Sequence, residues 1–348
     1  MKKAGRRVIL VDRWREHVDA INRDGLRIDG VRGSMTVPLE ARTRAELEGP
    51  LGFVFIATKS SDTAEAVRQI APFLTTGSVV VSMQNGLNED VIAECIGPER
   101  VIGAVPEYGA ALLGPGHIEF THEAPVHVGE LDGQITYRLL RTHELVSNVT
   151  TCYLSEDIRG RVWAKQVLMT EIVMTGLVDA TMHEALASVR NRFMGIALVR
   201  EALAVADAHR VQIPSDRFFY PSLYRSRDPE KIALNLFLID QHMRLVGQER
   251  RHETSYRFEK RGSGIWWDLV RRRRATETYW LTGEIVRRAQ RIGVPTPLNA
   301  RCAEMIYEIE RGERAVGWTN LDELAAFMRE CGESLVAPPQ LQLSDSVA

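Results

Sequence analysis

The first half of the chain alternates short apolar runs with amphipathic segments, and this rhythm restricts the possible folds more than any other feature. The runs Val8–Val11, Phe53–Ala57 and Val79–Ser82 are typical of buried parallel strands. Thr63–Leu74, between two of them, places its apolar residues on one side at helical spacing. We also predict helices over Arg15–Asp24 and Glu89–Ile96, a small hairpin of Leu26–Ile28 with Met35–Val37, and two closing strands within Gly116–Gly129. Because strand, helix, strand connections produce parallel sheets, we predict an α/β domain with a doubly wound sheet over residues 1–154.

Beyond about Asp157 the pattern changes to long helical segments. The predicted helices are Ile158–Val178, Asn191–His209, Ile265–Arg291, Ala300–Arg311 and Leu321–Arg329. We therefore predict an all-helical second domain over residues 155–333, followed by a disordered tail over 334–348. The charged and aromatic segment Arg217–Gly262 is interpreted as an insertion or a subunit-contact arm, and a homodimer is one expectation.

Composition excludes several classes of function. The net charge of −2 gives no general reason to expect a nucleic acid or an anionic membrane as partner. No apolar run approaches the length of a membrane span, and the four cysteines have no paired spacing, so we expect a reduced, cytoplasmic protein. His183 and His209 lack the spacing of metal ligands, and Arg271–Arg274 is interpreted as a solvated helix face.

The run VILVDR resembles the second strand of a dinucleotide-binding βαβ unit, ending in the acidic residue Asp12. In such a unit a G-x-G-x-x-G loop lies roughly 20 positions earlier, which here falls before Met1. We therefore expect the first strand and the glycine loop to be missing, with KKAG as a last helical turn and Gly5 as its C-cap. The alternative is that Val8–Val11 begins an unrelated α/β fold.

The order of short motifs is more specific than any one of them. They are LVDR, ATKSSDT, SMQNGLNE, EYGAALLGPGHIEFT, WAKQV, SGIWWDL, ATETYWLTG and GVPTPLN. In this order and spacing they resemble the ketopantoate reductase (2-dehydropantoate 2-reductase) family from Val8 to about Glu310. The resemblance implies a Rossmann-like domain followed by an all-helical domain of the 6-phosphogluconate dehydrogenase type. It also implies NADPH-dependent reduction of the 2-ketoacid ketopantoate to the 2-hydroxyacid pantoate, in pantothenate biosynthesis.

Lys165 is the sharpest candidate on physical grounds. On a helix it shares one face with Ile158, Val162, Met169 and Ile172. A lysine within an apolar stripe is costly unless its ammonium finds a partner or a cleft, or extends to water along its own stem. By resemblance, Lys165 is the catalytic lysine that protonates the substrate carbonyl oxygen, and desolvation lowers the pKa of such a lysine toward neutral.

The other site residues come from the resemblance. Glu277 corresponds to the glutamate near the nicotinamide ribose and the substrate hydroxyl, and it is the second catalytic candidate. Asn85 corresponds to an asparagine between cofactor and substrate, Lys59 to a cofactor contact, Ser263 to the serine that holds the substrate carboxylate, and Ala110 to a backbone contact with the nicotinamide. Without the resemblance, these residues are ordinary helix, turn and loop residues.

Two positions depart from the family pattern. Asparagines are usual four and eight residues after the catalytic lysine, where Met169 and Val173 stand here. Apolar side chains cannot form the hydrogen bonds that select the pantoyl group, so a different, bulkier or more apolar 2-ketoacid is an open alternative.

The cofactor is expected to be NADP, with NAD as the alternative. Asp12 favours the 2′-hydroxyl of NAD, whereas the neighbouring Arg13 favours the 2′-phosphate of NADP. Two further readings of the function stay open: a non-catalytic relic or binding protein that lacks its phosphate loop, and a related dehydrogenase of the hydroxyacid or opine type.

Overall fold

A computed structural model describes residues 1–216, 218–252 and 262–334 of the chain. The described residues divide into two compact units, and the chain passes from the first to the second between Val162 and Trp163, inside helix α5 (Ile158–Met174). The predicted boundary, at residues 154 and 155, lies a few residues earlier. The start of α5 belongs to the first unit because Ile158 and Val162 pack there against Val105.

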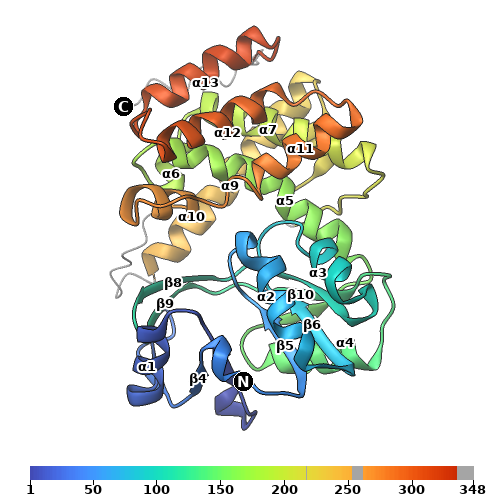
Figure 1. The fold of residues 1–348 in the computed structure, drawn as a ribbon. Helices are drawn as coiled ribbons and strands as arrows, with labels where there is room; N and C mark the ends of the chain where they lie inside the picture. The colour runs from blue at the N-terminus through green and yellow to red at the C-terminus, as the bar shows by residue number, and fades with distance from the viewer. Residues whose placement is uncertain (217, 253–261, 335–348) are drawn as a thin grey trace. The chain divides into compact units, whose positions relative to one another are not determined.

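The main sheet of the first unit has five strands in the order β11-β10-β7-β6-β5 (Figure 1). Strands β5 (Leu51–Ile56), β6 (Leu74–Ser82) and β7 (Val101–Pro106) are parallel, as their continuous apolar sequences predict. Strand β10 (Val126–Glu130) runs antiparallel to β7 and carries β11 (Cys152–Leu154) on its other side. The prediction of an α/β domain built on parallel strands is confirmed.

Helices pack on both faces of this sheet. Helices α2 (Thr63–Ile70) and α3 (Glu89–Ile96) contribute Val67 and Ile92 to a core that includes Val80. Helix α4 (Tyr137–Ser147) contributes Leu139 and Val146 to the opposite core, which includes Val79 and Val81. Successive β6 residues thus enter different cores, because side chains alternate across a strand.

A second, smaller sheet contains the strand that ends at Asp12. Strand β1 (Ile9–Val11) pairs in parallel with β4 (Glu40–Arg42), and helix α1 (Arg15–Asp24) follows β1 with the predicted bounds. Gly5 caps the short helix η1 (Lys2–Ala4) in the left-handed conformation, with φ of 77°. Across the described ranges, β1 pairs only with β4 and β5 only with β6.

A third sheet has four strands in the order β3-β2-β9-β8. It contains β2 (Leu26–Gly30), β3 (Met35–Val37), β8 (Gly109–Gly114) and β9 (His117–His122). The antiparallel pairing of β2 with β3 confirms the predicted hairpin. The two closing strands predicted within Gly116–Gly129 are present as β9 and β10, which join different sheets. Between them lies Pro125, which has no N–H to donate to a ladder.

The second unit is helical, as predicted. Its longer helices after α5 are α7 (Val189–Ala208), α9 (Pro229–His252), α11 (Thr282–Ile292), α12 (Pro297–Glu310) and α13 (Thr319–Glu330). Helix α7 is the centre of this unit, because it contacts α9, α11, α12 and α13 as well as the short α8 (Pro221–Arg225). Its middle, from Phe193 to Val199, is buried on all sides, whereas polar residues such as Arg190 and Asp207 near its ends are exposed. Within the segment read as an insertion, α8 and α9 pack on α7.

The single helix predicted over Ile265–Arg291 is wrong. The chain forms a short α10 (Gly264–Trp266), a π-helical turn (Trp267–Arg271) and then a non-helical segment before α11. Side-chain hydrogen bonds replace the helical ones there, as Thr276 donates to Glu310 at 2.7 Å. The tail predicted to be disordered lies almost entirely outside the described residues.

Candidate active site

In the first unit, two polar loops follow neighbouring parallel strands and are tied to each other. Lys59 begins the loop after β5, and Asn85 lies in the loop after β6. The Ser60 hydroxyl donates to the carbonyl oxygen of Asn85 at 2.6 Å. Asn88 donates through Nδ2 to the same carbonyl at 2.7 Å and to Ser60 Oγ at 3.1 Å. The loops that carry Lys59 and Asn85 are therefore held together at the carboxyl edge of the sheet, where ligands bind in this architecture.

A second layer of hydrogen bonds lies beneath these loops. Gln84 Nε2 donates to the Thr58 carbonyl at 2.9 Å and to Thr63 Oγ1 at 2.8 Å. Thr63 Oγ1 in turn donates to Asn88 Oδ1 at 2.9 Å. Gln84, Asn88 and Thr63 are all buried, so the network is shielded from water. These supporting residues were not predicted from the sequence, although the polar runs after two apolar strands were a usable signal.

Asp12 and Arg13 lie at the end of β1 and are both exposed. One oxygen of the Asp12 carboxylate accepts the backbone N–H of Trp14 at 2.8 Å, which fixes the side chain at the start of α1. Arg13 is 85% exposed and lies 3.4 Å from a carboxylate oxygen of Asp62. Asp12 therefore has the position expected of a ribose-binding acid, with a basic side chain beside it.

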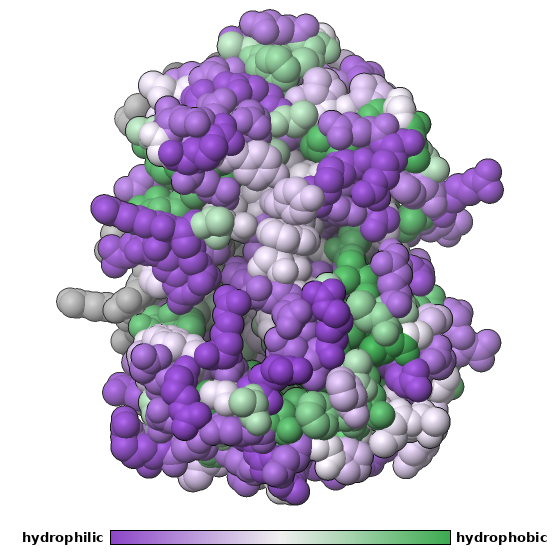
Figure 2. Space-filling model, viewed as in Figure 1, coloured by the Kyte–Doolittle hydropathy of each residue, from purple (hydrophilic) through white to green (hydrophobic). Residues whose placement is uncertain are grey.

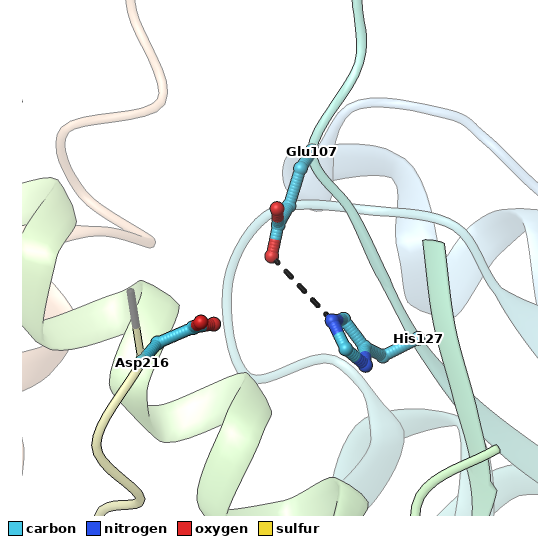
Figure 3. A group of neighbouring side chains, drawn as sticks. All are labelled: Glu107, His127 and Asp216. Atoms are coloured by element: carbon cyan, nitrogen blue, oxygen red, sulfur yellow. Dashed lines mark ion pairs between the residues drawn. The ribbon is translucent and has the colours of Figure 1, made fainter. Parts of the chain in front are cut away.

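The segment after β7 supplies a further acidic group. Glu107 directly follows β7, and its Oε1 lies 3.9 Å from Nε2 of His127 on β10 (Figure 3). This contact is an ion pair only when the imidazole is protonated. Ala110, the predicted nicotinamide contact, is an exposed residue of β8 whose partner on β9 is Phe120.

In the second unit, Lys165 lies on the partly exposed face of α5. Leu168, Met169 and Ile172 share this partial exposure, at the helical spacing expected for one face. The opposite side of the helix is fully packed, with Val167 and Val173 both 0% exposed. Of the two apolar residues that replace family asparagines, only Met169 thus lies beside Lys165, and Val173 belongs to the core.

The segment that carries Glu277 is fastened to α5. Gln166 Nε2 donates to the carbonyl oxygens of Leu281 at 2.9 Å and Trp280 at 3.2 Å. At the other end, the Thr276 N–H and hydroxyl both donate to the Glu310 carboxylate, at 2.8 and 2.7 Å. Glu277 is partly buried within this non-helical segment. Its position is therefore set by side chains on α5 and α12 and by no helix of its own.

Ser263 is the N-cap of α10 and is 4% exposed. Its Oγ accepts the backbone N–H of Trp266 at 3.2 Å, so the hydroxyl hydrogen is left to donate elsewhere. Helix α10 packs against the turn after α5, where a Cβ on Gly176 would lie 2.5 Å from the Ile265 side chain. Lys165, Glu277 and Ser263 are thus all on α5 or anchored to it.

Two buried carboxyl groups were also missed by the sequence analysis. Burial raises the pKa of Glu89, at the start of α3, to about 7, and burial raises the pKa of Glu171, on α5, to about 7 as well. The Oε1 atoms of both have no hydrogen-bond partner among the described residues. A Cβ on Gly195 would lie 2.6 Å from Glu171 Oε1, so α7 packs directly on this group. Both carboxyls are expected to hold a proton at slightly acidic pH.

Three further observations concern the polarity of the surface, the length of the helices and the exposure of the arginine run. Figure 2 shows polar residues over most of the face in view, interrupted by smaller apolar patches. In the described part of the chain, none of the helices combines the length and the apolar character that a membrane crossing requires. Arg271, Arg273 and Arg274 of the basic run are exposed, as predicted, but only Arg271 belongs to a helical turn, so the predicted helix face is wrong.

A sheet of parallel strands with polar loops at its carboxyl edge, followed by a helical unit with a lysine on an apolar face, is the architecture of a two-domain nicotinamide-dependent dehydrogenase. Comparison with known families agrees. "Ketopantoate reductase PanE/ApbA" matches residues 1–133, and "Ketopantoate reductase PanE/ApbA C terminal" matches residues 157–310. The chain belongs to the ketopantoate reductase family.

Individual relatives are distant but cover nearly all of the chain. A 2-dehydropantoate 2-reductase of Streptococcus pyogenes serotype M6 is 24% identical over 315 residues, which is 89% of this chain and 92% of that protein. One from Archaeoglobus fulgidus is 26% identical over 312 residues, with the same coverage.

Solved structures show the same fold. The ternary structure of D-mandelate dehydrogenase with NADH and anilino(oxo)acetate has a TM-score of 0.71 at 20% identity, covering 89% of this chain and 93% of that one. The PanE/ApbA family ketopantoate reductase from Ralstonia eutropha JMP134 has a TM-score of 0.70 at 23% identity, covering 90% and 93%.

Proposed function

We propose that this chain reduces a 2-ketoacid to the 2-hydroxyacid with a nicotinamide cofactor. The observation that carries the proposal is Lys165 on the partly exposed face of α5, with the Glu277 segment fastened to the same helix through Gln166. The bound nicotinamide would supply the hydride that reduces the keto carbon. Lys165 gives a proton from Nζ to the carbonyl oxygen and regains one from solvent, so charge and protons balance.

The other residues position the reactants. Glu277 orients the Lys165 ammonium, and the Ser263 hydroxyl donates to the substrate carboxylate. Asn85 holds cofactor and substrate, and Lys59, Asp12, Arg13 and the backbone of Ala110 contact the cofactor. Support for the Asn85 and Lys59 roles is the network that fixes both loops at the carboxyl edge of the sheet.

The residues at the end of β1 fit the adenosine ribose of such a cofactor. We propose NADP, since exposed Arg13 can meet the 2′-phosphate, and NAD is the alternative that Asp12 favours. Fluorescence titration of the purified chain with NADPH and NADH tests this. Tighter binding of NADPH is the expected result, and tighter binding of NADH would transfer the assignment to NAD.

The family name suggests ketopantoate as substrate and a place in pantothenate biosynthesis, and this is the first candidate. A related hydroxyacid or opine dehydrogenase is the second candidate, favoured by Met169 beside Lys165. Incubation with NADPH or NADH and a panel of 2-ketoacids tests the reaction itself. Consumption of the reduced cofactor with formation of the 2-hydroxyacid is expected, and no turnover with any member would contradict the proposal.

A non-catalytic binding protein is the third candidate. The same titration separates it from an enzyme, since a chain that binds neither NADPH nor NADH cannot transfer hydride.

We also propose a homodimer; one structural neighbour is a dimeric ketopantoate reductase from Staphylococcus aureus, with a TM-score of 0.63 at 14% identity. Sedimentation equilibrium measures the oligomeric state directly.

A further inference from the structure

The partly exposed face of α5 combines one ammonium group with a continuous apolar surface. Lys165 lies at one end, and Leu168, Met169 and Ile172 follow it at steps of three and four residues. Since one helical turn rises about 5.4 Å, the apolar residues extend over roughly 10 Å beyond the lysine. This is about the length of an aromatic ring or a branched aliphatic chain attached to a ketoacid group.

The apolar face has defined boundaries in the second unit. Near Lys165, Gln166 fastens the Glu277 segment to the helix. At the other end of α5, Ile265 packs so closely on Gly176 that a Cβ there would lie 2.5 Å away. The opposite side of the helix is closed by core packing, with Val167 at 0% exposure. On the C-terminal side of Lys165 the partly exposed surface of α5 is therefore formed by these three apolar residues, and on its N-terminal side Ala164 and Arg161 share the partial exposure.

We propose that the substrate is a 2-ketoacid with a bulky apolar group and that Met169 is a residue that determines this specificity. This inference rests on the proposed function. Lys165 engages the ketone while the apolar group packs on Leu168, Met169 and Ile172. A hydroxyl on that group, as in ketopantoate, would lose its water without gaining a hydrogen bond from these side chains.

The test compares kcat/KM for phenylglyoxylate and 2-ketoisocaproate, which are apolar, with that for ketopantoate. We expect both apolar substrates to exceed ketopantoate at least tenfold. In Met169→Asn this ratio should fall roughly tenfold, and Met169→Gln, which keeps the side-chain length, should lower it in the same direction. Leu234→Asn is the matched control, because Leu234 is 48% exposed on α9 and its replacement should leave the ratio unchanged.

A second measurement is independent of turnover. The shift of the thermal unfolding midpoint by each ketoacid reports binding without a cofactor. The inference is supported if phenylglyoxylate stabilises the protein more than ketopantoate does and if this stabilisation weakens in Met169→Asn. This holds even if no ketoacid is reduced, and in that case only the catalytic function fails. Preference for ketopantoate, or an unchanged ratio in the Met169 variants, overturns the inference and leaves the proposed reduction standing. If no ketoacid is reduced and none shifts the unfolding midpoint, both the inference and the proposed function are overturned.

Discussion

The side chain of Gln166 donates a hydrogen bond of 2.9 Å to the carbonyl oxygen of Leu281, and so connects α5 to the end of the segment that contains Glu277. The same amide donates to the Trp280 carbonyl at 3.2 Å. Gln166 is 1% exposed, so no water can take over these bonds if the amide is removed. The position of Glu277 relative to Lys165 therefore depends on a buried neighbour of the lysine.

Gln166→Leu is expected to lower kcat for ketoacid reduction roughly tenfold or more, with little change in KM. The leucine keeps most of the volume but removes the side-chain donor to the Trp280 and Leu281 carbonyls. The Leu281 carbonyl still accepts the backbone N–H groups of Glu284 and Ile285, so we expect a cost of about 1 kcal/mol and a loosened Glu277 segment. Steady-state kinetics and urea unfolding check this. Gln134→Leu, at an exposed loop position, is the control and should change neither quantity. Loss of stability with kcat intact would show a purely structural role.

Lys165→Met is expected to lower kcat about a thousandfold, since a positioned general acid contributes roughly 10²–10⁴ in rate. Stability should be kept or slightly raised, because methionine suits the apolar face of α5. Turnover of the best ketoacid with NADPH or NADH measures the effect, with Lys231→Met on the exposed side of α9 as control. A Lys165→Met variant that kept a third of the wild-type rate would exclude the proton-donor role.

Asn88→Asp is expected to weaken binding of NADPH roughly tenfold and to lower the free energy of unfolding by about 1–3 kcal/mol. Aspartate keeps the acceptor for Thr63 but loses the donor to Asn85 O and Ser60 Oγ. The loop that carries Asn85 would then lose one of its two anchors. Fluorescence titration and urea unfolding measure the two effects. Asn148→Ala, at the exposed end of α4, is the control. Unchanged affinity in Asn88→Asp would refute this account of the loop.

Stability is expected to fall as the pH rises from 5 to 7 and then to level off. The folded-state pKa of Glu89 and of Glu171 is about 7, above the value of 4.5 for an exposed carboxyl. In this range the folded chain holds protons that the unfolded chain has released, so raising the pH favours unfolding. The loss should be on the order of a few kcal/mol, reached when both carboxyls ionise.

Urea unfolding at pH 5 and pH 8 checks this dependence. The double variant Glu89→Gln and Glu171→Gln should flatten it, because an amide does not titrate. Replacing the exposed Glu16 by Gln should leave it as in the wild type. A wild-type protein equally stable at both pH values would contradict the raised pKa values.

Local sequence was sufficient to determine several elements. Helices α1 and α3 have the predicted bounds, and Gly5 ends a helical turn in the left-handed conformation that glycine adopts without strain. The partial exposure of Lys165 beside Met169 also follows from helical spacing alone. These features depend on neighbours within one or two turns, which the sequence displays directly.

Only the tertiary structure decided how distant segments combine. The non-helical segment before α11 is stabilised by the hydrogen bond from Thr276 to Glu310, which are 34 positions apart. Helical periodicity did not indicate this interruption of the predicted helix. Asn88 donates to Ser60 and accepts from Thr63, and these bonds join segments that meet only because β5 and β6 are neighbours in the sheet. Hydrogen bonds between residues far apart in the chain leave no periodic pattern, so their partners are known only once the strands and helices are packed.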